Sequence, residues 1–192
     1  MNTPNKLTVL RILLVPVLLA TMFLIPENLY CGWVASLVNA ALFGLISLTD
    51  MLDGKLARKH NLITNFGKFL DPLADKILVV SVLVAFISMG YISSLVVIIV
   101  IIREFAVTSL RLIAASDNVV IAASPFGKLK TVFQIITILV LFLNPLAKNY
   151  LSGFNFNYKL IFDIFSWAMA VITVLSGADY IKKNIHLINH TK

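Results

Sequence analysis

Charge is scarce in this sequence. Only 13% of its 192 residues are Asp, Glu, Lys or Arg, against roughly 25% in soluble domains, and 59% are apolar. The shortage of charge excludes a soluble globular domain and a disordered chain. Cysteine is rarer still, because Cys31 is the only one, so the chain is not a disulfide scaffold and forms no internal disulfide.

The charges that are present leave long stretches empty. Residues 28–49, 77–102 and 131–147 contain no Asp, Glu, Lys or Arg. A membrane-spanning helix needs about 20 mostly apolar residues, and two of these stretches reach that length. Continuous apolar runs also exclude a β-barrel, whose strands alternate polar and apolar residues. The sequence therefore predicts an all-α polytopic membrane protein, with residues 1–192 as a single integral-membrane domain.

Six transmembrane helices fit these runs. We expect them at about 9–26, 31–50, 71–90, 92–115, 129–147 and 160–181. Thr3 and Pro4 are typical of a helix start, which suggests a short interfacial helix before the first span. Arg11 lies against the first apolar run and no small-residue cleavage site clearly follows it, so we do not expect a cleaved signal peptide.

Positive charge indicates the orientation. The net charge is +7, and the cytoplasmic connections of membrane proteins are enriched in Lys and Arg. The connections on one side hold Lys6, Arg11, Lys55, Arg58, Lys59, Lys68, Lys128, Lys130, Lys182, Lys183 and Lys192. Those on the other side hold only Lys148 and Lys159. We therefore expect both termini and the 51–70 loop in the cytoplasm, with the excess charge beside anionic membrane lipids and no nucleic-acid partner.

Four of the nine acidic residues lie within 26 positions. Asp50 and Asp53 share a face at the end of the second expected helix, and Asp71 and Asp75 share a face at the start of the third. Because these helices are antiparallel neighbours, the two pairs can meet at one depth. Each pair of bare carboxylates at ~4 Å would repel by about 4 kcal/mol, so a cation must neutralise them. Oxygen ligands without His or Cys suit Mg²⁺, Mn²⁺ or Ca²⁺, and this many carboxylates suit two ions.

Two other interpretations of these acids stay open. One makes them loop charges solvated at the membrane edge, and the other makes them the carboxylates of a divalent-cation transporter. Gly54, Ala57 and Gly67 favour a ligand site instead, because small residues let a bulky group approach closely. Arg58 adds a bidentate donor for phosphate oxygens, which a cation transporter does not need.

Together these residues form a motif, Asp50-x2-Asp53-Gly54-x2-Ala57-Arg58-x8-Gly67-x3-Asp71-x3-Asp75. The motif resembles the signature of the CDP-alcohol phosphatidyltransferase family at all eight fixed positions, and the chain length and expected helix number are similar too. The resemblance implies a membrane transferase that moves a phosphatidyl group from a CDP-linked lipid to an alcohol and releases CMP. It also implies a homodimer.

The resemblance implies a role for each motif residue. Two ions, Mg²⁺ or Mn²⁺, would be held by Asp50, Asp53, Asp71 and Asp75. Asp75 would take the proton of the acceptor hydroxyl, and Asp71 would be the second catalytic residue. The substrate-binding residues would be Asp53, Gly54, Ala57, Arg58 and Gly67, with the three small residues at the cytidine. No residue near the four acids stands out as a nucleophile, so we expect direct attack by the acceptor.

The fourth expected helix suggests where the acceptor binds. Arg103 lies near its middle, where an unpartnered cation is costly, and Arg111 follows two turns later on the same side. Lys128 and Lys130 open the next helix, so positive residues lead toward the Asp cluster and suit an anionic acceptor such as an alcohol phosphate. An alternative is that Arg103 pairs with Glu104 or an Asp and only holds helices together. Lysines are also expected in any cytoplasmic loop.

Three stretches resemble one bacterial branch of the family, which uses glycerol 3-phosphate as the acceptor. They are Pro4–Arg11, Arg103–Arg111 and Gly127–Thr131. The resemblance implies CDP-diacylglycerol and glycerol 3-phosphate as substrates, with Arg103, Arg111 and Lys128 at the acceptor, in the bacterial cytoplasmic membrane. Inositol phosphate and phosphatidylglycerol stay open as acceptors. The three histidines, His60, His186 and His190, are expected to be solvated.

Overall fold

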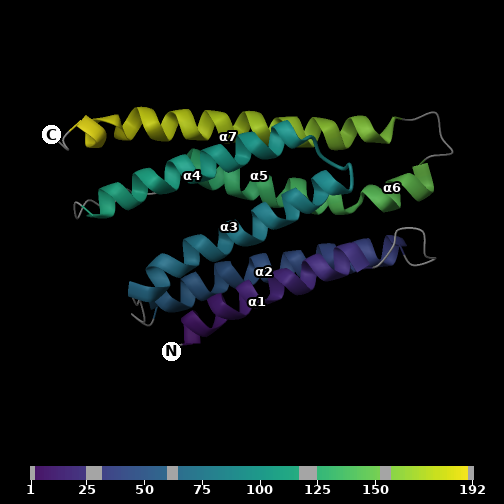
Figure 1. The fold of residues 1–192 in the computed structure, drawn as a ribbon, viewed down its shortest axis with the longest axis horizontal. Coiled ribbons are helices and arrows are strands. Elements are labelled where there is room, and N and C mark those ends of the chain that lie inside the picture. The colour runs from purple at the N-terminus through teal and green to yellow at the C-terminus, as the bar shows by residue number, and fades with distance from the viewer. Residues whose placement is uncertain (1–2, 25–31, 60–64, 117–124, 152–156, 190–192) are drawn as a thin grey trace.

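Seven helices make up the described part of the chain (Figure 1). They are α1 (Thr3–Leu24), α2 (Gly32–Lys59), α3 (Asn65–Ser88), α4 (Ser94–Ser116), α5 (Pro125–Phe142), α6 (Asn144–Leu151) and α7 (Tyr158–Asn189). The computed structural model describes the backbone of residues 3–24, 32–59, 65–116, 125–151 and 157–189. Side chains are described there except at 3–7, 32, 50–59, 65–72, 115–116 and 185–189. The described backbone contains no strand, which confirms the predicted all-α class.

Several helix ends differ from the expected ones. The start signal at Thr3 opens α1 itself, so residues 3–24 form one helix instead of an interfacial helix and a span. α2 continues to Lys59 and α3 begins at Asn65, so most of the expected 51–70 loop is helical. Hydropathy marks only the apolar part of a helix, whereas the Leu, Lys, Ala and Arg residues that end α2 are good helix formers. The motif positions therefore lie on the adjoining ends of two helices.

A break at Leu143 divides the expected helix 129–147. α5 ends before this residue and α6 begins after it. Pro145 has no N–H and restricts the residue before it, so an unbroken helix is unfavourable here. The Ser36 hydroxyl of α2 donates a hydrogen bond to the Phe142 carbonyl. α2 thereby satisfies a carbonyl at the end of α5.

The helices form two groups that share one interior (Figure 1). α1 packs against α2 and α3 in one group, and α4 and α5 pack against α7 in the other. α3 contacts α4 and α5, and α2 contacts α5 and α6. The start of α1 and the end of α7 lie at one end of the bundle, together with the end of α2 and the start of α3. We call this the motif end, and we call the opposite end, where α6 lies, the α6 end.

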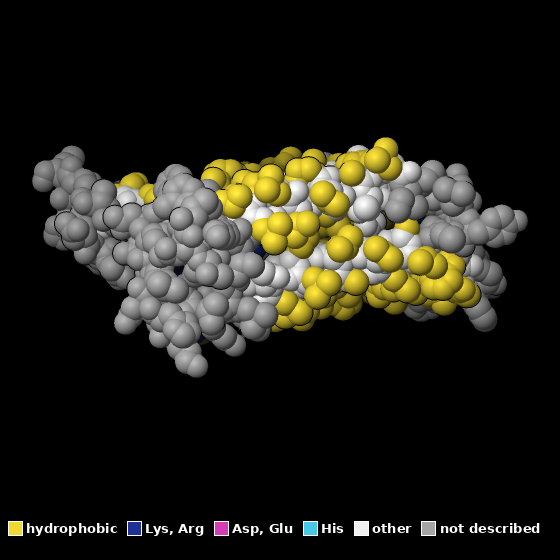
Figure 2. All heavy atoms as spheres, turned by 90° about the horizontal axis from the view of Figure 1, so that it is seen from below, with side chains coloured by type: hydrophobic (Ala, Val, Ile, Leu, Met, Phe, Trp, Pro, Cys, Tyr) yellow, Lys and Arg dark blue, Asp and Glu magenta, His cyan; other side chains and the backbone are white. Residues whose placement is uncertain are grey.

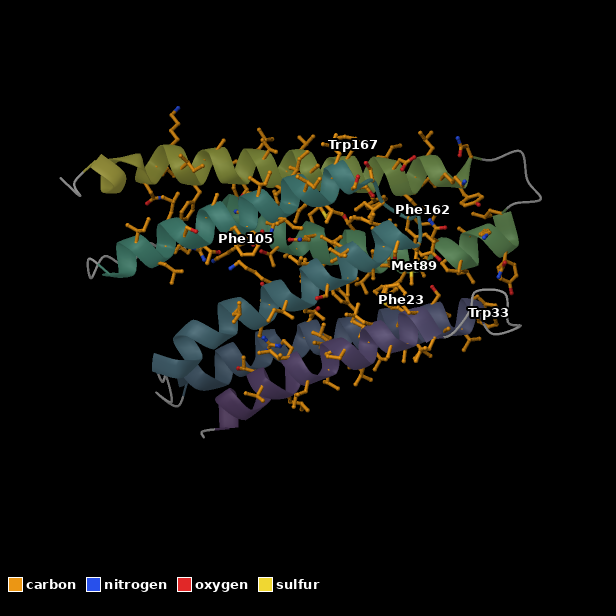
Figure 3. All side chains as sticks on the ribbon, viewed as in Figure 1. Phe23, Trp33, Met89, Phe105, Phe162 and Trp167 are labelled. Atoms are coloured by element: carbon orange, nitrogen blue, oxygen red, sulfur yellow. The ribbon has the colours of Figure 1, made fainter. Side chains whose placement is uncertain are left out.

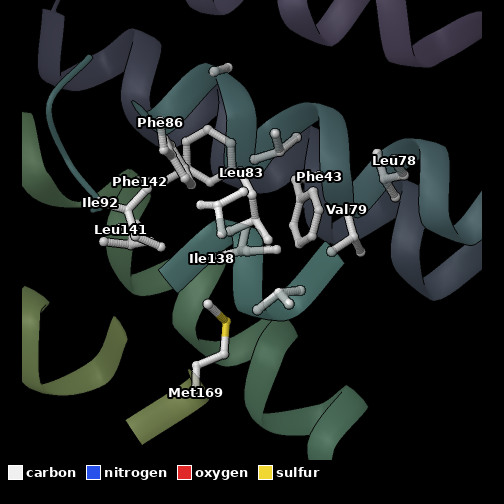
Figure 4. Close-up of a cluster of buried hydrophobic side chains, with 14 of the residues drawn as sticks. Phe43, Leu78, Val79, Leu83, Phe86, Ile92, Ile138, Leu141, Phe142 and Met169 are labelled. Atoms are coloured by element: carbon white, nitrogen blue, oxygen red, sulfur yellow. The ribbon is translucent and has the colours of Figure 1, made fainter. Parts of the chain in front are cut away.

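Three phenylalanine rings join the two groups in the core (Figure 4). Phe43 on α2 and Phe86 on α3 both contact Phe142 on α5, with ring centroids 6.0 and 4.9 Å apart. None of the three residues is more than 3% exposed. Such pairs contribute about 0.5–1.5 kcal/mol each beyond the burial of apolar area. This packing fixes α2, α3 and α5 relative to one another. It therefore also fixes the relative positions of the parts of these helices that lie toward the motif end.

Many large apolar side chains are exposed on the outside of the bundle, and they cover much of the described part of the face in Figure 2. Leu13, Leu24 and Ile102 are each more than 60% exposed. Water is a poor solvent for so continuous an apolar surface, whereas lipid chains are a suitable one. The outside of the bundle therefore resembles the lipid-facing surface of a membrane protein.

Within the described helices, two stretches are long and apolar enough to cross a bilayer. They are Pro125–Phe142 in α5 and Tyr158–Asn184 in α7, and shorter apolar helices cover Thr8–Leu24 and Trp33–Thr49. α4 is apolar apart from the charges at its middle and its end. Together with the apolar surface, these helices agree with an integral membrane protein.

Candidate functional site

A cluster of buried and partly buried charges lies between α4, α5 and α7. The ammonium of Lys130 on α5 contacts the carboxylate of Glu104 on α4, and these side chains are 5% and 13% exposed. Arg103, which is 12% exposed, donates from Nη1 to the same carboxylate at 3.2 Å. Buried ions are tolerated only when they are paired and hydrogen-bonded. We call Arg103, Glu104 and Lys130 the charged cluster, in which one carboxylate faces two cations.

α7 shapes the place that Arg103 occupies. The Ser176 hydroxyl accepts a hydrogen bond from Arg103 Nη2 at 2.8 Å. The next residue, Gly177, leaves room for the arginine, because a Cβ atom there would lie 2.9 Å from Arg103 Cγ. Arg103 Nε is buried and has no hydrogen-bond partner among the described residues. α7 thus fixes the guanidinium group while one of its donors stays unused.

Arg111 extends the positive charge toward the motif end. Its Nε donates to the Tyr180 hydroxyl at 3.2 Å, and its guanidinium carbon lies 5.3 Å from the centre of that ring, within cation–π range. Val107, between the two arginines, is buried. Since Ser176 and Tyr180 lie one turn apart on α7, Arg103 and Arg111 contact the same helix from the same side of α4.

α3 brings a motif aspartate and a further lysine toward this cluster. Asp75 belongs to the electrostatic surroundings of Lys130. Lys76, its neighbour in the chain, lies in the field of Glu104, Asp75, Arg111 and Arg103. Sequence reasoning missed Lys76, because a lysine at the cytoplasmic start of a span is expected in any case. Only the packing of α3 against α4 and α5 distinguishes it.

The two lysines at the start of α5 differ in their surroundings. Lys128, which the sequence predicts at the acceptor, is exposed, whereas Lys130 is buried and bonded to Glu104. The two positions are two residues apart and so lie on different faces of the helix. The structure places Lys130, and not Lys128, beside Arg103.

Most of the motif lies outside the described side chains. This holds for Asp50, Asp53, Gly54, Ala57, Arg58, Gly67 and Asp71, and also for His60, His186 and His190. The backbone of the seven motif residues is helical, so the positions of Asp71 and Asp75 lie one turn apart on α3. Where side chains are described, no three His, Cys, Asp or Glu residues gather as a metal site would require. The two-metal site therefore stays a prediction.

The described part of the site can bind an anion. Its charged groups are four cations and two carboxylates, namely Arg103, Arg111, Lys76, Lys130, Glu104 and Asp75. The excess of positive charge lies partly out of water, where each interaction with an anion is strengthened. The contact between Arg103 and Glu104 also agrees with the alternative that Arg103 holds helices together. A purely structural ion pair would require neither the buried Arg103 Nε that lacks a partner among the described residues nor the neighbouring cations.

The sequence is similar to known proteins over almost its whole length. The family described as CDP-alcohol phosphatidyltransferase matches residues 1–177. A CDP-diacylglycerol–glycerol-3-phosphate 3-phosphatidyltransferase of Bacillus subtilis (strain 168) is 44% identical over 190 residues, which cover 95% of each chain. A protein of the same name from Rickettsia bellii (strain RML369-C) is 35% identical over 182 residues, which cover 94% of each chain.

Proposed function

The chain belongs to the CDP-alcohol phosphatidyltransferase family, and we propose that it transfers the phosphatidyl group of CDP-diacylglycerol to glycerol 3-phosphate. The products are phosphatidylglycerophosphate and CMP. The observation that carries this proposal is the near full-length similarity to relatives of that name. Membership of a transferase family decides between an enzyme and a cation transporter in favour of the enzyme.

The charged cluster supports an acceptor that carries a phosphate. In this proposal Arg103, Arg111 and Lys130 face the phosphate of glycerol 3-phosphate, with the exposed Lys128 at the entrance. Arginine presents a fork of donors that matches phosphate oxygens, and Arg103 Nε is a buried donor without a partner among the described residues. Glu104 holds Lys130 and Arg103 in place through its carboxylate. Inositol phosphate also carries a phosphate that these cations could bind, so it is one of the acceptors in the test below.

The metal site of the proposal consists of Asp50, Asp53, Asp71 and Asp75. The donor set fits two hard divalent ions such as Mg²⁺ or Mn²⁺, because it contains only carboxylate oxygens and its members lie three or four positions apart in helices. Bound ions would neutralise the pyrophosphate and the charge that develops on its bridging oxygen. The cations near Asp75 belong to the acceptor side of the same site.

The remaining motif residues bind the nucleotide and move a proton. Gly54, Ala57 and Gly67 leave space for the cytidine, and Arg58 lies near its phosphates. Asp75 takes the proton of the acceptor hydroxyl, because an aliphatic alcohol is a poor nucleophile while it is protonated. The hydroxyl oxygen then bonds to the phosphatidyl phosphorus, the bond from that phosphorus to the bridging oxygen breaks, and CMP leaves with that oxygen.

The proposal includes a topology and an assembly. Six helices span the bacterial cytoplasmic membrane, with the motif end and both termini in the cytoplasm. The position of the start of α1 and the end of α7 at one end of the bundle supports an even number of spans. The large excess of Lys and Arg in the connections of that end supports the cytoplasmic side. The homodimer rests on the family resemblance alone.

The test is CMP release by the purified protein in detergent with CDP-diacylglycerol and Mg²⁺. Glycerol 3-phosphate, inositol phosphate, phosphatidylglycerol, serine and no acceptor are supplied in parallel. The proposal expects CMP only with glycerol 3-phosphate, and no CMP after a chelator removes divalent ions. CMP with inositol phosphate alone would keep the chemistry and change the acceptor. No CMP with any acceptor, from folded protein, would contradict the proposed function.

A further inference from the structure

A second group of charges lines a cavity at the α6 end, away from the motif. The cavity has a volume of about 320 Å³, within the range of ligand pockets, and three segments meet around it. They are the turn between α3 and α4, the short helix α6 and the first turns of α7. Its polar lining consists of Lys148, Lys159, Asp163, Asn144, Tyr91 and Tyr158.

The lysines of this cavity are unusual for their side of the molecule. The connections at the α6 end contain only Lys148 and Lys159 as positive residues, and they are separated in sequence by the end of α6 and the start of α7. The break at Leu143 turns the chain into α6, and this helix carries Lys148 to the cavity where α7 begins with Lys159. Both lysines of the α6 end therefore line the same cavity, whereas scattered surface charges would lie apart.

The composition of the cavity favours a phosphate group attached to an apolar molecule. Two ammonium groups can bind one phosphate as point charges, and the first turn of α7 adds the positive end of a helix dipole. Asp163 can accept hydrogen bonds from hydroxyl groups next to that phosphate. Met89 and Phe162, which Figure 3 labels at this end of the bundle, line the apolar part.

The surroundings place the cavity where a lipid headgroup would lie. Helices with exposed apolar surfaces converge on it, and the stretch Tyr158–Asn184 that begins at its rim is long enough to cross a bilayer. Tyr91 and Tyr158 are of the residue type that gathers at membrane–water interfaces. Lysine stems of four carbons can lie along apolar surface while the ammonium reaches the phosphate.

We propose that this cavity binds a phosphate-bearing anion at the membrane surface, namely the headgroup of an anionic phospholipid held by Lys148 and Lys159. The site is separate from the phosphatidyl-transfer site, since it lies at the opposite end of the bundle. Free phosphate shares the same chemistry and is distinguished by the test. The lipid would be taken from the leaflet that faces away from the motif end.

The test measures lipid binding to the full-length protein in detergent. Bound phosphatidylglycerol and phosphatidylcholine are counted by native mass spectrometry over a range of lipid concentrations, for the wild type and for Lys148→Gln/Lys159→Gln. A matched control, Lys182→Gln/Lys183→Gln, removes two exposed lysines near the other end of α7. A rescue variant, Lys148→Arg/Lys159→Arg, keeps the charge. Inorganic phosphate is titrated as a competitor in each case.

We expect the apparent Kd for phosphatidylglycerol to rise about 10- to 30-fold in the Gln variant, while the control and rescue variants stay within about threefold of wild type. Phosphatidylcholine binding should not change. Displacement of the lipid by millimolar phosphate from the wild type alone would keep the site and make soluble phosphate its ligand. Equal binding of both phosphatidylglycerol and phosphate to the wild type and the Gln variant would overturn the proposal.

Discussion

The two ends of the bundle both gather cations, but they hold them differently. Toward the motif end, the buried Lys130 and the partly buried Arg103 share the carboxylate of Glu104. At the α6 end, Lys148 and Lys159 are exposed around an open cavity. A buried ion depends on its partner, whereas water also stabilises an exposed ion, whether or not it has a partner. We therefore expect substitutions in the charged cluster to disturb stability and catalysis together, and substitutions of the two lysines at the α6 end to disturb only binding.

The largest effect is expected from Asp75→Asn. The amide cannot take a proton from the acceptor, and loss of a general base typically costs about 10²–10⁴-fold in rate. The rate of CMP release with saturating substrates measures it. The protein should remain folded, because asparagine has nearly the same shape.

Asp179→Asn is the matched control for that variant. Asp179 lies on α7 near the same end, and its carboxylate forms an ion pair with Lys183 at 2.8 Å on the surface. This variant should release CMP at the wild-type rate. Equal losses of CMP release in both variants would mean that any carboxylate near the motif end affects the rate. That result would contradict the role of Asp75 as the general base.

Glu104→Gln should give the largest loss of stability. It leaves the buried Lys130 without its anion, and removal of one partner from a buried pair costs about 3–5 kcal/mol. In a chain of this size, the unfolding temperature should fall by roughly 6–20 °C. Asp179→Asn breaks an exposed pair, so its unfolding temperature should fall by less than about 4 °C. Similar falls would show that burial does not distinguish the two pairs.

The two lysines at the start of α5 offer a finer comparison within one helix. Lys130→Gln should raise the KM for glycerol 3-phosphate by about 10- to 100-fold, because a charged hydrogen bond to phosphate contributes about 1.5–3 kcal/mol. Lys128→Gln should raise it by less than about fivefold, because Lys128 is exposed and screened. The KM for CDP-diacylglycerol should change little in either. A larger effect at Lys128 would reverse the order that burial predicts.

Gly177→Ala tests whether α7 positions Arg103. The added Cβ would lie 2.9 Å from Arg103 Cγ, so the arginine must shift, and the KM for glycerol 3-phosphate should rise about 3- to 10-fold. Gly44→Ala is the control, because no heavy atom lies within 4 Å of its added Cβ. It should leave KM unchanged and raise the unfolding temperature slightly, since alanine favours a helix by about 0.5–1 kcal/mol. An unchanged KM in Gly177→Ala would indicate that Arg103 does not bind the acceptor.

Sequence reasoning reached the helical class and the motif but not the details of the site. Apolar runs identify where helices cross lipid, but they contain no information on how far a helix continues beyond it. They therefore do not predict the extensions of α2 to Lys59 and of α3 back to Asn65. Pro145 was a visible signal for the break before α6, since proline disfavours a helix interior. The fixed spacing of the eight motif residues made the family recognisable without any fold.

Burial is what the sequence could not provide. Lys128 and Lys130 are equivalent as residue types, and only the packing of α5 against α7 decides which of them faces inward. The same holds for Lys76 and for the meeting of Lys148 with Lys159, because both depend on contacts between segments distant in sequence. The depth of Arg103 predicts a partner or a polar cavity, since a charge in the middle of an apolar helix requires one, whereas its place at the acceptor comes from the family resemblance and from its alignment with Arg111.

The most direct test of the central claim compares glycerol 3-phosphate with glycerol as acceptors for the wild-type protein. The two share the attacking hydroxyl and differ in the phosphate that Arg103, Arg111 and Lys130 are proposed to bind. Loss of charged hydrogen bonds worth about 3 kcal/mol or more predicts a kcat/KM for glycerol at least about 10²-fold lower, measured as CMP release with CDP-diacylglycerol. Equal kcat/KM values for the two acceptors would contradict the account, because Arg103, Arg111 and Lys130 would then have no part in choosing the acceptor.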